Sequence, residues 1–282
     1  MFPILKKRRL NDSMTLMVVR APLIARKAHA GQFIILRVNE QGERIPLTIA
    51  DYDREQGTVT IIYQIVGKTT LLLDQLNEGD SILDFVGPLG KPSHLEGYQN
   101  AAVIGGGAGC AIAYPQAKTL HARGAKVDII AGFRTKDLII LENEMRAASD
   151  RLFLMTDDGS NGHKGFVTDA LKKNIEAGAG YDLVVAIGPL VMMRAVCNLT
   201  KKYGIKTIIS MNPIMIDGTG MCGGCRLTVG GKTRFACVDG PDFDGQEVDF
   251  DEAIRRSRTY SEMERKSAQE FKCRLLEEAK NA

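Results

Sequence analysis

The spacing of apolar residues changes near residue 97, and this change divides most of the chain into two large parts. Before it, short runs rich in β-branched residues recur between turn residues, as in "MTLMVVRAP", "GQFIILRV", "GTVTIIYQIVG" and "DSILDFVG". Short strands at regular spacing predict an antiparallel barrel or sandwich. One short helical run, "TTLLLDQL", follows Gly67. We therefore predict an antiparallel β domain over residues 1–96.

From residue 97 to residue 210 the pattern consists of continuous apolar runs that alternate with stretches of helical length. The runs are "NAAVIGGG", "KVDIIAGFR", "RLFLMTDDG", "DLVVAIGP" and "KTIISMNP". The stretches between them include "KDLIILENEMRAAS" and "GFVTDALKKNIEAG". Strands that are apolar on both faces and alternate with helices predict a parallel sheet covered on both sides. We predict an α/β domain over residues 97–210.

The rest of the chain has too few apolar residues for a third large core. Residues 211–245 are rich in glycine and cysteine, and so small a unit needs a staple such as a bound metal. Residues 246–282 carry mixed charges at helical density. They predict a C-terminal helical tail that is either solvated or packed against a partner.

Composition and charge narrow the class of protein. Of the 282 residues, 44% are hydrophobic and 25% are charged, and the net charge is +3. The composition is ordinary for a globular protein, and the charge is too weak and dispersed to favour nucleic acid. The N-terminus "MFPILKKRRLND" lacks the features of a secretory signal, and no apolar run reaches about 18 residues. We expect a cytoplasmic protein without a membrane segment, in which clustered cysteines indicate metal or redox chemistry.

Three of the six cysteines lie in "IDGTGMCGGCRLTVGGKTRFAC", residues 216–237. Cys222 and Cys225 can reach one metal centre if the glycines between them allow a tight turn. Cys237 follows a hairpin-like segment and would close the site. Together with Asp217 the pattern is D-x4-C-x2-C-x11-C. A cysteine in place of Asp217 would complete a plant-type [2Fe–2S] pattern, and an anionic carboxylate can take the role of that thiolate.

Two other interpretations of this cysteine cluster remain open from the residues alone. Structural zinc usually takes four cysteines, or cysteines with histidine, so three cysteines and an aspartate would be an unusual zinc set. The thiols could also be unligated. The remaining cysteines, Cys110, Cys197 and Cys273, are scattered, and we expect them to be small apolar fillers or inert surface thiols.

The first strand of the α/β domain ends in glycines, at positions 105 to 107 and 109, before a helical segment. Glycines let a diphosphate approach the backbone, and a helix N-terminus favours its negative charge. The motif is not a clean G-x-G-x-x-G, and the next strand ends in "GFRT" without an acidic residue for a ribose. A tight turn without a ligand is the alternative. Asp157 and Asp158, at a later strand end, could likewise face a ligand or simply solvent.

Two segments of the β domain also have groups that could bind an anion. In "ERIPLTIADYD", Arg44 has a fork of donors for phosphate and Thr48 has a hydroxyl. In "YQIVGKTT", Gly67, Thr69 and Thr70 combine a backbone turn with hydroxyls at a helix start. The alternative is an exposed arginine and an ordinary helix cap.

The order of these motifs is more informative than any one of them. "RIPLT" and "VGKTT" come first, "GGGAG" opens the α/β domain, "GP" ends a later strand, and a cysteine-bearing tail follows. In this order the chain resembles the ferredoxin–NADP reductase superfamily along nearly its whole length. The tail resembles that of the dihydroorotate dehydrogenase electron-transfer subunit, which uses four cysteines. With Asp217 it is more similar to the small subunit of electron-bifurcating NADH-dependent ferredoxin:NADP oxidoreductase, also described as a sulfide dehydrogenase subunit.

This resemblance implies an FAD-binding β-barrel over residues 1–96, an NAD(P)-binding α/β domain over 97–210 and a [2Fe–2S]-binding domain over 211–245, followed by the tail. It implies that Arg44 holds the FAD diphosphate, while Thr48 approaches the flavin ring and Pro46 and Leu47 wall it. The residues implied for the adenine–diphosphate side are Gln64, Val66, Gly67, Thr69 and Thr70. Those implied for NAD(H) are Gly107, Ala108, Gly109, Arg134, Asp157, Gly188 and Pro189. The cluster ligands would be Asp217, Cys222, Cys225 and Cys237.

Two positions depart from the family pattern. The superfamily motif R-x-Y-S corresponds here to "RIPLT", which is one residue longer and lacks the tyrosine. The family's frequent cysteine before the final G-P is Ile187 in this chain.

The resemblance further implies a heterodimer with a large flavoprotein subunit that carries a second FAD and [4Fe–4S] clusters. This chain would exchange hydride with NAD(H) and relay electrons to the large subunit, with ferredoxin reacting through the complex. No side-chain acid or base is required, so no catalytic residue is predicted. One alternative is the electron-transfer subunit of a dihydroorotate dehydrogenase or of a sulfide or polysulfide reductase. Another is a zinc-stabilised regulatory or binding module without redox activity.

Overall fold

The N-terminal part of the chain forms a nearly closed antiparallel barrel in the computed structural model, which describes residues 1–281 and the side chains of residues 1–274. Its strand order is β6-β1-β2-β5-β4-β3-β7. Only Leu83 separates the edge strands β6 and β7, so the bend there brings the two edges of the sheet together. The elements are β1 (Phe2–Asn11), β2 (Met14–Arg20), α1 (Pro22–Lys27), β3 (Phe33–Arg37), β4 (Ile45–Asp53), β5 (Thr58–Gln64), α2 (Lys68–Gln75), β6 (Ser81–Ile82) and β7 (Asp84–Leu89).

The barrel core follows the alternation that a strand imposes on its side chains. Met17 and Val19 of β2, and Ile61 and Tyr63 of β5, point into one buried cluster, while the residues between them are only partly buried. The strands expected from these alternating runs are confirmed. The sequence pattern did not predict β1 or β4. β1 is strongly basic and β4 contains Pro46, which argues against a strand, and pairing with neighbouring strands determines both.

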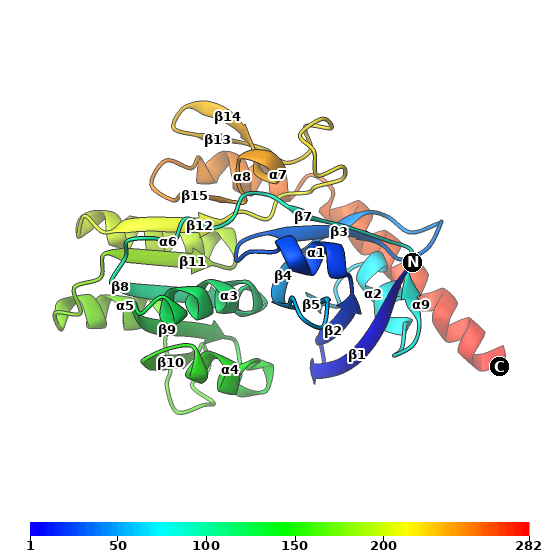
Figure 1. Ribbon diagram of the computed structural model, residues 1–282, viewed down its shortest axis with the longest axis horizontal. Coiled ribbons are helices and arrows are strands. Elements are labelled where there is room, and N and C mark those ends of the chain that lie inside the picture. Colours follow the sequence, from blue (N-terminus) through cyan, green and yellow to red (C-terminus); the bar gives the residue numbers. More distant parts are fainter. Residues whose placement is uncertain (282) are drawn as a thin grey trace.

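The second domain is a sheet of five parallel strands in the order β10-β9-β8-β11-β12, with the antiparallel strand β15 (Asp242–Asp244) at the edge beyond β12 (Figure 1). Its core clusters place α3 and α4 on one face and α5 and α6 on the other, as predicted for continuous apolar strands. The elements are β8 (Asn100–Gly106), α3 (Gly109–Ala122), β9 (Lys126–Phe133), a 3-10 turn η1 (Lys136–Leu138), α4 (Glu142–Ala147), β10 (Arg151–Thr156), α5 (Val167–Glu176), β11 (Leu183–Ile187), α6 (Leu190–Lys202) and β12 (Lys206–Ser210).

The stretch "KDLIILENEMRAAS" does not form one helix, contrary to expectation. Leu141 is buried and has φ +55°, a left-handed conformation that interrupts a right-handed helix. As a result only η1 and the short α4 form, on either side of Ile139–Leu141. Tertiary burial of the apolar residues overrides the local helical pattern here.

The cysteine-bearing segment folds around a small hairpin and remains attached to the parallel sheet. β15 extends that sheet by pairing antiparallel with β12. Figure 1 shows the hairpin and α7 at the β15 edge of that sheet. The elements are β13 (Arg226–Val229), β14 (Lys232–Phe235), α7 (Ala236–Asp239) and β15 (Asp242–Asp244).

The C-terminal tail forms the two helices α8 (Phe250–Ser257) and α9 (Ser261–Asn281). Phe250 and Ala253 of α8 are buried in the same core as Leu227 of the hairpin, so this part of the tail packs within the chain. α9 contacts α2 of the barrel and then extends past it (Figure 1). Among the described residues, no helix combines the length and apolar character needed to cross a membrane.

Candidate cofactor sites

The glycine-rich turn lies where the strand order of the parallel sheet reverses. β8 is followed by β9 and β10 on one side and by β11 and β12 on the other. Ligands of open α/β sheets bind outside the carboxyl ends of the strands at this kind of switch point. Gly107 has φ +55°, and a Cβ on it would meet nothing within 4 Å. The backbone is therefore open to a ligand at Gly107.

Gly109 and Gly188 bring the two neighbouring turns into contact. A Cβ on Gly109 would lie 2.3 Å from the carbonyl oxygen of Ile187, and one on Gly188 would lie 3.1 Å from Cα of Gly106. Close packing of α3 against β11 thus requires a glycine at 109. Pro189 is the N-cap of α6, directly after this contact. The structure brings together residues 107–109 and 188–189, as the predicted nucleotide site needs.

Arg134 and Asp157 follow β9 and β10 at the same edge of the sheet, and both side chains are exposed. The Asp157 amide donates to the carbonyl of Phe133 at 3.0 Å, which ties the two loops together. Asp158 has a different role, because its carboxylate accepts from the amide and hydroxyl of Ser160. These bonds lower the pKa of Asp158 and fix the turn.

The predicted flavin residues lie on one end of the barrel. Pro46, Leu47 and Thr48 belong to β4 and are each partly exposed, while Gln64, the last residue of β5, and Val66, just beyond it, are exposed. They lie on or directly after adjacent strands of one sheet, because β4 pairs with β5.

The turn before α2 is built by Thr70. Its Oγ1 accepts hydrogen bonds from the amides of Val66 and Gly67, each at 3.0 Å. Thr69 is buried and its hydroxyl donates to Glu43 Oε2 at 3.4 Å. The helix-cap interpretation of Thr70 is therefore confirmed by geometry, and the cap shapes the turn whether or not an anion binds there.

Arg44 reaches from the barrel to the cysteine-bearing segment. Its Nε donates to the carbonyl oxygen of Ile216 at 2.8 Å, across 172 positions of sequence. Among the side chains that the structure describes, none accepts a hydrogen bond from the two terminal nitrogens of Arg44. The sequence pattern contained no signal for this contact, because it joins segments that fold in different domains.

Asp217 organises the loop that leads to the cysteines. Its Oδ1 accepts from the amide of Thr219 at 2.9 Å, and its Oδ2 accepts from the amides of Met221 and Cys222 at 3.1 and 2.7 Å. The hydrogen bond from Thr219, with those from Cys222 and Met221, lowers the pKa of the Asp217 carboxyl. Asp217 is therefore an anionic side chain, able to act as a metal ligand, that lies at the start of the cysteine motif.

The four predicted ligands form two pairs. Asp217 and Cys222 are adjacent in one loop, and the amide of Cys237 donates to Cys225 Sγ at 3.5 Å. Within the described part of the chain, no three His, Cys, Asp or Glu side chains converge tightly enough for a single metal ion. A two-iron cluster takes two protein ligands on each iron, so a paired donor set with three thiolates suits it better than one tetrahedral ion.

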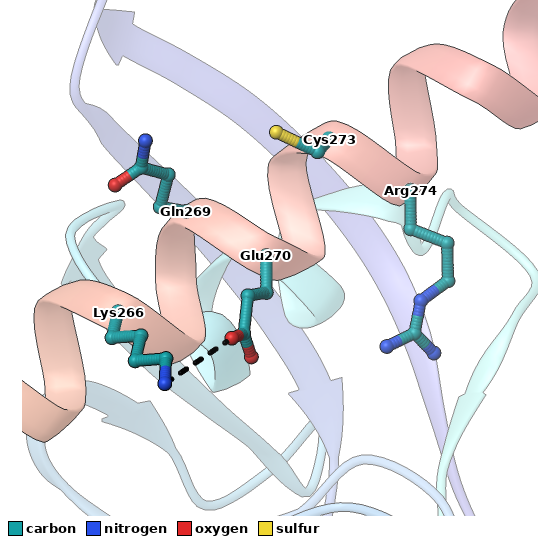
Figure 2. Close-up of a pocket in the computed structure, with 5 residues that line it drawn as sticks. All are labelled: Lys266, Gln269, Glu270, Cys273 and Arg274. Atoms are coloured by element: carbon teal, nitrogen blue, oxygen red, sulfur yellow. Dashed lines mark ion pairs between the residues drawn. The ribbon is translucent and has the colours of Figure 1, made fainter.

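The other cysteines match their expected roles where the structure describes them. Burial raises the pKa of both Cys110 and Cys197 to about 12, which keeps these thiols protonated and inert. Cys273 is exposed on α9. Together with Lys266, Gln269, Glu270 and Arg274 it lines a hollow of about 520 Å³ (Figure 2). None of the predicted site residues lies there, and its lining comes from α9 alone.

Comparison with known proteins agrees with this arrangement. Residues 212–249 match the iron-sulfur cluster binding domain of dihydroorotate dehydrogenase B. An electron transfer subunit homolog of dihydroorotate dehydrogenase B (NAD(+)) from Thermotoga maritima is 46% identical, covering 95% of this chain and 94% of the relative. The corresponding electron transfer subunit of Fusobacterium nucleatum is 35% identical, covering 78% of this chain and 87% of the relative.

A solved structure of NADH-dependent reduced ferredoxin-NADP oxidoreductase, described for flavin-based electron bifurcation, contains a similar chain. The two chains superpose with a TM-score of 0.90 and are 43% identical, and the alignment covers 95% of this chain and 97% of that one. The expected barrel, parallel-sheet and iron–sulfur architecture is thereby confirmed. The chain belongs to the family of dihydroorotate dehydrogenase B electron-transfer subunits, is similar within it to the electron-bifurcating ferredoxin-NADP oxidoreductase, and is an oxidoreductase subunit of a larger complex.

Proposed function

We propose that this chain is the NAD(H)-reacting, electron-transfer subunit of a flavin-based electron-bifurcating NADH-dependent ferredoxin:NADP oxidoreductase. It holds FAD and a [2Fe–2S] cluster, and its partner is a large flavoprotein subunit with FAD and [4Fe–4S] clusters. The observation that carries the proposal is the set of candidate metal ligands, one aspartate and three cysteines. The loop that contains the aspartate contacts the proposed flavin domain through the hydrogen bond from Arg44 to Ile216.

When bound, the flavin exchanges a hydride with the nicotinamide and single electrons with the cluster. The chain's own residues supply position and charge. Arg44 and the α2 turn at Gly67, Thr69 and Thr70 hold the flavin diphosphate. Pro46 and Leu47 of β4 pack against the flavin ring, and Thr48 lies close to it. Gln64 and Val66 line the adenine side.

NAD(H) lies over the switch point of the parallel sheet in this proposal. The open turn at Gly107 to Gly109 receives the diphosphate at the N-terminus of α3, and the turn at Gly188 and Pro189 borders the nicotinamide. Arg134 and Asp157, exposed on the adjacent loops, contact the rest of the nucleotide. Asp217, Cys222, Cys225 and Cys237 ligate the cluster.

The proposal is tested by purifying the chain with any native partner and measuring flavin, iron and sulfide. We expect this chain to account for one FAD, two irons and two sulfides, as in a [2Fe–2S] flavoprotein, in addition to the FAD and [4Fe–4S] clusters of a co-purified large subunit. A colourless protein that contains zinc would support a regulatory module and refute the redox function.

A dihydroorotate dehydrogenase or a sulfide or polysulfide reductase subunit is the second candidate. The match of residues 212–249 to the dihydroorotate dehydrogenase B domain favours it. Identification of the co-purifying large subunit separates the two, because a dihydroorotate dehydrogenase partner would exclude the bifurcating assignment.

A further inference from the structure

The segment that carries Asp217 is held by the barrel on both sides of that residue. On one side, the Ile216 carbonyl accepts the hydrogen bond from Arg44 Nε at 2.8 Å. On the other side, Gly218 lies against the barrel wall, where an added Cβ would be 2.7 Å from Leu89 Cδ1 and 2.8 Å from Ile35 Cδ1. The position of Asp217 is therefore set by contacts with the barrel.

Two of the three cysteines, Cys225 and Cys237, are held differently. Both are buried in the core that the hairpin shares with the parallel sheet and α8. Arg256 of α8 donates to the carbonyl of Gly224 at 3.1 Å and thereby fixes the loop between Cys222 and Cys225. Cys225 and Cys237 thus have a support on the α8 side that Asp217 lacks, although Ile35 of the barrel belongs to the same core. Cys222 is joined to Asp217 through its amide.

Arg44 can join the barrel support to an anion on the flavin side. Nε is committed to Ile216, whereas the terminal nitrogens have no partner among the described side chains. A guanidinium is planar, so two of its edges can bind different acceptors at the same time and orient each other. A diphosphate on the free edge would fix the plane of the guanidinium and, with it, the hydrogen bond to Ile216.

We propose that Arg44 is a positioning residue that couples flavin binding to cluster binding, because its guanidinium holds the Asp217 segment while it binds the flavin diphosphate. This inference rests on the proposed function, since it requires both groups to bind. Coupling between two sites is reciprocal. The cluster must therefore strengthen FAD binding by the same factor by which FAD strengthens retention of the cluster.

The test measures the Kd for FAD in the full-length chain with the cluster intact and after its removal by an iron chelator. Hydrogen–deuterium exchange of residues 216–222, with and without FAD, is measured on the cluster-free protein. We expect FAD to bind at least about fivefold more tightly to the cluster-loaded chain. We also expect FAD to slow exchange in residues 216–222 even without the cluster.

The variant Arg44→Lys keeps the positive charge but has one compact ammonium in place of the planar fork. It should retain FAD binding, lose the dependence of the Kd on the cluster to within twofold, and lose the FAD effect on exchange. The variant Gly218→Ala tests the other contact, because its Cβ collides with Ile35 and Leu89 and its φ of +77° strains an alanine. It too should reduce the coupling while FAD still binds.

Arg256→Lys is the matched control, since it weakens an arginine–carbonyl contact on the cysteine side only. It should speed cluster loss by the same factor with and without FAD, and the coupling should stay at the wild-type value.

The outcomes distinguish this inference from the proposed function. Absence of FAD binding to the wild-type chain refutes the proposed function. FAD binding of equal strength with and without the cluster refutes the coupling alone. Full coupling in Arg44→Lys overturns the role of Arg44. If that variant loses FAD altogether, full coupling in Gly218→Ala would overturn the inference instead.

Discussion

Asp242 lies where three parts of the molecule meet, and its ionisation should lower the stability of the fold near neutral pH. Asp242 belongs to β15. Its Oδ2 accepts a hydrogen bond at 2.5 Å from Ser93 Oγ, in the interdomain connector (residues 90–99, between β7 and β8), and one at 3.3 Å from Gln116 Nε2 of α3. The Ser210 hydroxyl, at the end of β12, also favours the charged form of Asp242. Among the described residues, no group bonds to Asp242 Oδ1 or Gln116 Oε1, and both atoms are shielded from solvent.

Burial raises the pKa of Asp242 from 3.8 to about 6, although the hydroxyls of Ser93 and Ser210 and the amide of Gln116 favour the carboxylate. The folded state therefore binds the proton more tightly than the unfolded state. The stability contributed by protonation is complete below pH of about 4 and is lost as pH rises through about 6. The full loss is at most about 3 kcal/mol, of which about 2 kcal/mol falls between pH 4.5 and 8.

The substitution Asp242→Asn isolates this contribution. Asparagine stays neutral and keeps the size of the acid, and its amide oxygen can still accept the hydrogen bond from Ser93. We expect the free energy of unfolding of the variant, relative to wild type, to rise by about 2 kcal/mol from pH 4.5 to pH 8. For a chain of this length this equals about 4 °C in Tm, measured by thermal denaturation at matched cofactor content.

The control is Glu96→Gln, on the same connector, because the Glu96 side chain is 76% exposed in its pair with Arg123. It should follow the wild type at each pH. A constant difference between Asp242→Asn and wild type, within about 0.5 kcal/mol over the whole range, would show that no tightly bound proton resides on Asp242.

Substitutions at four further positions test the proposed sites. Asp217→Cys should keep a cluster with a changed reduction potential, and Asp217→Ala should make it labile; unchanged EPR spectra and potentials in both would show that Asp217 is not a ligand. Arg134→Ala should weaken NAD(H) binding, measured by titration, more than it lowers flavin content, whereas an equal loss of both would argue against its assignment. Gly109→Ala should destabilise the fold by about 2 kcal/mol through its collision with the Ile187 carbonyl, as measured by urea denaturation. Gly107→Ala, whose Cβ meets nothing within 4 Å, should cost stability only through its φ of +55°, about 1 kcal/mol, and should weaken nucleotide affinity. A larger loss of stability at 107 than at 109 would contradict this division of roles.

The sequence alone predicted the order of the domains, most of the strands and the spacing of the cysteine motif. These features depend on local periodicity, because a strand repeats every two residues and a buried parallel strand is apolar on both faces. It failed for β1 and β4, since a basic run and Pro46 weaken the local pattern and only pairing with neighbouring strands overrides it. It also failed at Leu141, where burial imposes a left-handed conformation on an apolar residue.

Only the tertiary structure decided how the motifs are divided between binding and support. Thr70 caps α2, Gly109 permits α3 to touch β11, and Asp242 accepts hydrogen bonds at a junction of three elements. The contact of Arg44 with Ile216 spans 172 positions, so no pattern within either segment encodes it. The sequence determined which residues are available for each site through local spacing, whereas packing between distant segments decided which of them meet.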